Sequence, residues 1–263
     1  MIFLEITLLP QVSFLNFNPM RRLKLIIEYD GTNYHGWQRQ PAFRTIQQTL
    51  EEALEKIIQT KTPVIGTSRT DRGVHALGQV AHCQIESPIS NIHLLKGLNT
   101  ILPADIKIKK LKTVDEAFHA QKQARSKIYV YHILNRPSPS PLLRHYSWWL
   151  RSPLNVSKMK KAAKLLCGEH DFKAFQNTGT KLISTTRTLF KSTVQKKSPY
   201  IIYEVKGSGF LKQMVRNIVG ALVAVGKENL TVEEFGALLI SKNRRFCPPP
   251  APPQGLFLKK IFH

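Results

Sequence analysis

A stretch in the middle of the chain alternates between two sets of side chains, and this period of two constrains the fold most. Lys127, Tyr129, Tyr131 and Ile133 face one way, and the residues between them face the other. Such alternation is typical of a strand, and the prolines from Pro137 onward end it. The chain must therefore build a sheet around this segment.

Other strands and helices follow one another in hairpin-like groups, without strict β-α-β alternation. Thr45 and Thr231 each precede a glutamine or glutamate by three residues, which is the signature of a capped helix start. This pattern predicts an α+β fold of two mixed α/β subdomains, with mainly antiparallel sheets flanked by helices and any catalytic cleft between them. The expected strands are 24–29, 64–67, 79–85, 106–114, 127–134, 145–150, 186–194, 200–207 and 256–261, and further helices are expected over 92–98, 157–167 and 211–225.

The first twenty residues stand apart from this pattern. Glu5 and Pro10 interrupt their apolar stretches, and the early residues lack the Lys or Arg of a secretory leader. They are also too polar for a membrane-spanning helix. Because Met20 directly precedes the first convincing strand, we expect either that translation begins there or that residues 1–19 are an N-terminal extension outside the native fold. The remaining chain divides into an N-terminal subdomain, 20–113, and a C-terminal subdomain, 114–263.

Positive charge dominates the composition. Lys and Arg number 39 against 17 for Asp and Glu, which gives a formal net charge of +22. Such an excess attracts polyanions through counterion release, although a basic solvated surface gives the same composition. No basic amphipathic helix points to a membrane, so RNA or DNA is the expected partner. The three cysteines form no CxxC pair, which favours reduced thiols in a cytoplasmic protein.

The polar segment from Ser68 to Ala76 lies between two expected strands and carries the best candidate for chemistry. Asp71 stands between Arg69 and Arg72, and neighbouring positive charge favours an ionised carboxylate. An ionised carboxylate serves as a covalent nucleophile or a general base. An ordinary surface turn with an Asp–Arg ion pair explains the same residues, and the composition alone leaves both interpretations open.

This segment, SRTDRGVHALGQVAH, resembles the catalytic segment of the TruA family of tRNA pseudouridine synthases, whose usual form is GRTDAGVHA. Three more segments resemble family motifs in the expected order: YDGTNYHGWQRQP, AFHAQKQARSKIYVYHILN and GFLKQMVRNIVGALVAVG. GEHDFKAF and PPQGLFL add weaker agreement. The resemblance extends from about Lys24 to Leu258. One such motif is a weak signal, but four in register are specific.

The resemblance implies a role for each matching residue. Asp71 corresponds to the catalytic aspartate, and Arg69 to an arginine that holds or displaces the target nucleotide. Tyr129 corresponds to a tyrosine that stacks on the target base, although strand tyrosines are more often core residues. Arg216 corresponds to an arginine that pairs with the aspartate, and a buried arginine needs such a partner. Two residues depart from the family pattern: Ser68 replaces glycine and Arg72 replaces alanine.

The resemblance further implies that the enzyme is a homodimer acting on the anticodon arm of tRNA, at uridines 38–40, without cofactor or metal. Asp71 could attack C1′ of the nucleotide or act as a base at the 2′ carbon, and the sequence does not choose. The alternative function is a non-catalytic, basic RNA-binding protein. A zinc base deaminase needs H-x-E and P-C-x-x-C elements, which this sequence lacks. The spacing of His75 and His82 matches no familiar zinc pattern.

Overall fold

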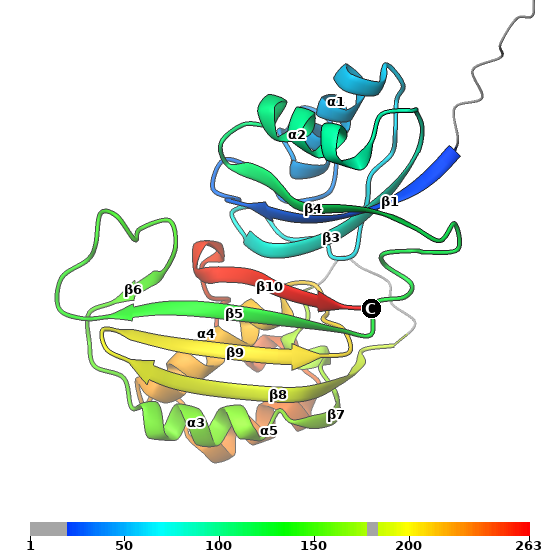
Figure 1. Cartoon of the computed structure of the whole chain (residues 1–263). Coiled ribbons are helices and arrows are strands. Elements are labelled where there is room, and N and C mark those ends of the chain that lie inside the picture. The colour runs from blue at the N-terminus through cyan, green and yellow to red at the C-terminus, as the bar shows by residue number, and fades with distance from the viewer. Residues whose placement is uncertain (1–19, 178–183) are drawn as a thin grey trace, which may run out of the picture.

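Ten strands form one sheet in a computed structural model that describes residues 20–177 and 184–263. The strand order is β4-β1-β3-β10-β5-β9-β8-β7, with β2 paired to β3 and β6 to β5 (Figure 1). The expected extension, residues 1–19, lies outside the described residues. The strands are β1 (Met20–Tyr29), β2 (Ile65–Gly66), β3 (His75–Glu86), β4 (Ile106–Val114), β5 (Ser126–Asn135), β6 (Trp148–Leu150), β7 (Gly168–Asp171), β8 (Thr186–Lys197), β9 (Tyr200–Gly207) and β10 (Leu256–Phe262).

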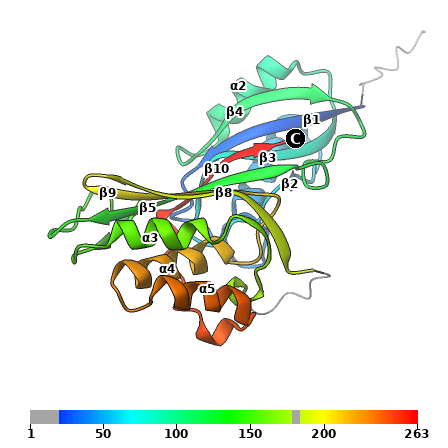
Figure 2. The same ribbon diagram turned by 90° about the horizontal axis from the view of Figure 1, so that it is seen from below.

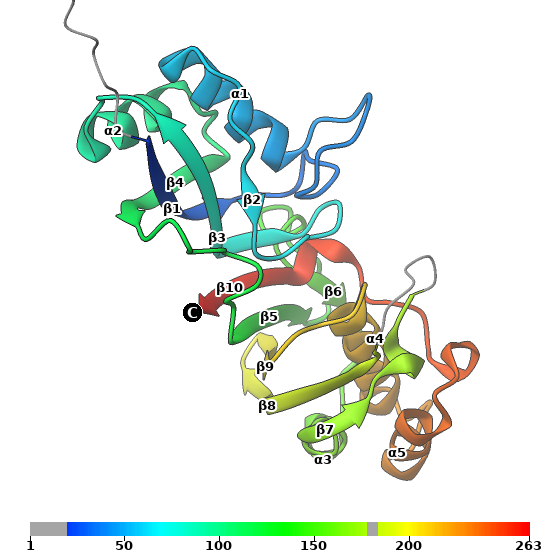
Figure 3. The ribbon, with the colours of Figure 1, turned by 90° about the vertical axis from the view of Figure 1, so that its right-hand side faces the viewer.

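The first half of the sheet consists of β4, β1 and β3, which pair antiparallel. Leu23, Leu25 and Ile27 on β1 are fully buried and alternate with more exposed neighbours. Helix α1 (Ile46–Ile58) and helix α2 (Asn91–Ile101) lie together over this half, as Figure 3 shows. The half therefore buries one sheet face under two amphipathic helices.

The second half consists of β5, β9, β8 and β7, again antiparallel. Three helices pack together beside it (Figure 2): α3 (Val156–Lys164), α4 (Met214–Gly226) and α5 (Val232–Ser241). Helix α4 is buried along almost its whole length, and it contacts both α3 and α5. Short 3₁₀ turns cover 173–175, 244–246 and 253–255.

Strand β10, near the C-terminus, joins the two halves. It pairs parallel with β3 through Phe257 opposite His75, and antiparallel with β5 through Leu258 opposite Tyr129 (Figure 1). One strand therefore separates the start of β3, which follows the Asp71 loop, from the strand that carries Tyr129. The expected boundary at residues 113 and 114 falls at the end of β4.

The predicted α+β class with a mainly antiparallel sheet is confirmed. The C-terminal end of α3 differs from the expectation that Gly168 caps a helix over 157–167. The helix ends at Lys164 with Leu165 still in a right-handed conformation, and Gly168, at φ +105°, begins β7 instead. None of the described helices is long and apolar enough to cross a membrane.

Candidate active site

The Asp71 loop, residues 67–74, is anchored at its start by a buried amide side chain. Gln79 on β3 is fully buried, and its Nε2 donates to the Ser68 carbonyl at 2.6 Å while its Oε1 accepts from the Ser68 N–H at 3.3 Å. The Thr67 N–H donates to the Val80 carbonyl at 2.8 Å. Because these bonds satisfy the backbone, the loop leaves the sheet in one defined direction. Serine at position 68 does not prevent this anchoring.

The loop that follows β1, residues 30–44, packs directly against the Asp71 loop. The Trp37 N–H donates to the Thr70 carbonyl at 3.1 Å, and the Gly73 N–H donates to the Tyr34 carbonyl at 3.3 Å. Gly36, at φ +90°, makes the close approach possible, since a Cβ there would lie 2.4 Å from the Thr70 oxygen. Two segments that looked like separate motifs in the sequence therefore form one unit.

Asp71 forms an ion pair with Arg216 of helix α4. The Arg216 guanidinium lies 3.2 Å from Asp71 Oδ2, and its Nε donates to the Ala251 carbonyl at 2.8 Å. The side chains of Asp71 and Arg216 are 28% and 13% exposed. Asp71 Oδ1 accepts no hydrogen bond from any described residue, so one carboxylate oxygen is anchored and the other has no partner within the described chain. The expected pairing of Arg216 with Asp71 is thus present in the structure.

The neighbouring arginines do not pair with the carboxylate. Arg69 and Arg72 are both exposed, and within the described chain neither lies within 4 Å of a carboxylate. The sequence placed two arginines next to Asp71, but the charge partner of Asp71 in the folded chain is Arg216, 145 residues further along. The two exposed guanidinium groups are instead available to an anionic ligand.

Tyr129 lies near Asp71, but its ring belongs to the core. The residue is 8% exposed and packs edge-on against Phe210, with ring centroids 5.1 Å apart. Burial, together with the smaller effect of the Asp71 charge, raises the pKa of Tyr129 to about 12. The phenol therefore stays protonated at neutral pH and can donate a hydrogen bond. The stacking role implied by the resemblance stays a prediction, because a base reaches this ring only if the covering residues move.

His75, directly after the loop, is a structural residue that the sequence did not single out beyond a rejected metal role. It is 1% exposed; its Nδ1 accepts from the Gly31 N–H at 3.1 Å, and its Nε2 donates to the His145 carbonyl at 2.8 Å. Burial lowers the pKa of His75 and so favours the neutral ring, although the Asp30 carboxylate 3.1 Å from Nδ1 acts in the opposite direction. His82 is also buried, and burial lowers its pKa to about 4. Over residues 20–177 and 184–263 no group of three or more His, Cys, Asp or Glu side chains could hold a metal ion.

A family model described as tRNA pseudouridine synthase matches residues 25–121 and 162–262. The tRNA pseudouridine synthase A of Thermoanaerobacter sp. (strain X514) is 44% identical over 244 residues, which cover 93% of this chain and all of the relative. The protein of the same name from Acetivibrio thermocellus is 41% identical over equal coverage, and that from Maridesulfovibrio salexigens is 44% identical over 93% of this chain and 91% of its own length.

The family model and the relatives match the chain over nearly its whole length, including the Asp71 loop. The protein is therefore an isomerase of the pseudouridine synthase class. Within that class, the chain belongs to the TruA family of tRNA pseudouridine synthases. The match with the family model includes both residues of the Asp71–Arg216 ion pair.

Replacing Gly36 with alanine should disturb the Asp71 loop. The new Cβ would meet the Thr70 carbonyl and sit in a left-handed backbone region, which costs about 1–3 kcal/mol of folding free energy. We expect a lower urea midpoint and slower pseudouridine formation. Gly236→Ala on α5 is the control, because its Cβ meets only Leu165 at an ordinary 3.5 Å. Equal midpoints and rates for both variants would contradict the packing described.

Proposed function

We propose that this enzyme converts uridines 38–40 in the anticodon arm of tRNA to pseudouridine, with Asp71 as its catalytic residue. The observation that carries the proposal is the state of the carboxylate: Oδ2 is tied to Arg216 at 3.2 Å, while Oδ1 accepts no bond from the described residues. A carboxylate that is oriented on one oxygen and unoccupied on the other is suited to meet a reacting atom.

The reaction breaks the N1–C1′ bond of uridine and joins C1′ to C5 of the same base. N1 leaves with the bonding electrons, and the rejoined base loses the proton on C5 and gains one on N1, so no redox change occurs. Asp71 acts either as a nucleophile at C1′ or as a base at the 2′ carbon. In both routes the uracil gains negative character, which the guanidinium groups of Arg216 and Arg69 can offset, and Tyr129 stacks on the base once the residues that cover its ring have moved.

The charge of the chain supports RNA as the macromolecular substrate. A net charge of +22 favours a phosphate backbone, and a uridine within a stem must be unstacked at a cost of a few kcal/mol before Asp71 can reach it. Exposed Arg69 and Arg72, on either side of Asp71, are placed to contact the displaced nucleotide. A non-catalytic RNA-binding protein would gain nothing from a carboxylate at this point, since the carboxylate repels phosphate.

The decisive variant is Asp71→Asn. It keeps the side-chain size but removes the nucleophilic or basic oxygen, so we expect pseudouridine formation to fall by at least about 100-fold while tRNA still binds. Carbodiimide-dependent primer stops on an unmodified tRNA transcript locate the product. Glu116→Gln is the matched control, because it removes an exposed carboxylate outside the site. Full conversion by Asp71→Asn would rule out the catalytic assignment.

We also propose that the enzyme is a cytoplasmic homodimer. The support for the dimer is the resemblance to the family, and the support for the compartment is the free thiols of Cys83, Cys167 and Cys247. Sedimentation equilibrium at micromolar concentration should give twice the mass of the 30.0 kDa chain. A single species at the monomer mass would contradict the dimer and leave the catalytic proposal untouched.

A further inference from the structure

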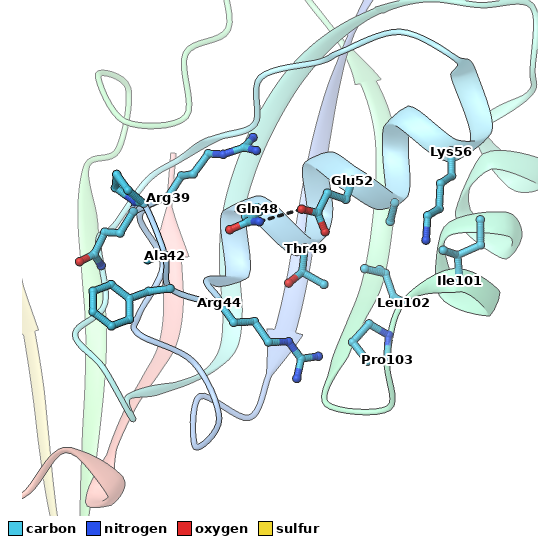
Figure 4. A pocket seen from close by; sticks show the side chains of 14 residues that line it. Arg39, Ala42, Arg44, Gln48, Thr49, Glu52, Lys56, Ile101, Leu102 and Pro103 are labelled. Carbon is cyan, nitrogen blue, oxygen red and sulfur yellow. Dashed lines mark hydrogen bonds between the residues drawn. The ribbon is translucent and has the colours of Figure 1, made fainter.

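An open groove of about 880 Å³ lies between the segment 39–44, helix α1 and the end of helix α2. Figure 4 shows Arg44 extending toward Pro103 and Lys56 beside Ile101, with Gln48, Thr49 and Glu52 on α1 between them. The groove contains none of the Asp71 loop residues. The groove is therefore distinct from the candidate active site, and the function of its lining residues is a separate question.

Phe43 supplies an aromatic surface at this groove. Its side chain is 47% exposed, and one face stacks on the His35 ring with centroids 4.2 Å apart and planes at 28°. A single exposed apolar residue is ordinary, but a ring that is already stacked on one face and open to a groove can receive a second planar group. Nucleobases stack on such rings irrespective of sequence, because every base has a π-face.

Cationic side chains line the groove further along from the aromatic surface (Figure 4). Arg44 lies over the Tyr34 ring at 4.6 Å, and in the described part of the chain neither Arg44 nor Lys56 has a carboxylate within 4 Å. Arg39, by contrast, pairs with Glu51 at 2.8 Å. Two uncompensated cations and an exposed ring in one groove match a single-stranded segment, which offers phosphates and bases along its length.

One segment, residues 30–44, contacts the Asp71 loop and also lines the groove. The His35 N–H donates to the Arg44 carbonyl at 2.9 Å, and two residues later the Trp37 N–H donates to the Thr70 carbonyl beside Asp71. Phe43, which borders the groove, and His35, on which it stacks, thus belong to the same loop that packs against Asp71. A strand of RNA that presents a nucleotide to Asp71 can continue along this loop into the groove.

We propose that the groove binds an unpaired segment of the same tRNA, with one base on Phe43 and a phosphate between Arg44 and Lys56. The proposal rests on the proposed function, since it gives the RNA substrate a second contact away from the reacting uridine. Glu52 lies in the groove wall and accepts from Gln48 at 2.8 Å. Its charge opposes phosphate binding and should limit the affinity of the site.

Phe43→Ala tests the stacking contact. The Kd for a fluorescently labelled, unmodified tRNA transcript should rise by about 5- to 150-fold, as expected for the loss of one base–aromatic stack. At subsaturating tRNA, pseudouridine formation should fall by the same factor as the affinity. Phe43→Trp should restore the affinity. Phe190→Ala is the control, since this 55% exposed ring lies on β8 in the other half.

Two charge changes should shift the affinity in opposite directions. Arg44→Gln should raise the Kd by about tenfold and reduce the slope of log Kd against log salt by about one, while Glu52→Gln should lower the Kd by about two- to fivefold. If Phe43→Ala and Arg44→Gln bind tRNA as tightly as wild type, the groove proposal is wrong, and an acidic protein partner becomes the better explanation. A wild-type enzyme that makes no pseudouridine would instead overturn the proposed function.

Discussion

The ion pair between Asp71 and Arg216 is the contact on which the site depends, because its members come from opposite halves of the molecule. Asp71 belongs to the loop before β3, and Arg216 to the first turn of α4. Strand β10 fixes their separation, since it pairs with β3 on one side and β5 on the other. The Ala251 carbonyl, shortly before β10, accepts from Arg216 Nε and so ties this helix to the segment that enters the joining strand.

Local patterns predicted most of the elements. Strands β4 and β9 have the expected bounds, and the helix after Thr231 begins with a complete capping box. Strand β7 was missed, because its short polar sequence shows no alternation and Gly168 suggested a helix cap. The continuous sheet was not foreseen either. The pairing of β10 with β3 joins segments about 180 residues apart, and periodicity carries no information at that range.

Part of the candidate site was predicted from the local sequence pattern, and another part only from the family resemblance. The segment around Asp71 was visible as a polar loop between strands, whereas the partnership with Arg216 came only from the family resemblance. Sequence adjacency pointed wrongly to the flanking arginines as partners of the carboxylate in the folded chain. The roles of Gln79 and Gly36 were missed, since a buried amide and a single glycine have no signature until the loops that they hold are placed together.

The central claim is that Arg216 orients the Asp71 carboxylate for reaction, and single-turnover kinetics test it most directly. Arg216→Lys keeps a positive charge but loses the planar group that reaches both Asp71 and Ala251. With unmodified tRNA in single turnover, the account predicts a rate at least about 100-fold below wild type and a tRNA Kd within about threefold. Pseudouridine formation by a folded Arg216→Lys enzyme at the wild-type rate would contradict it.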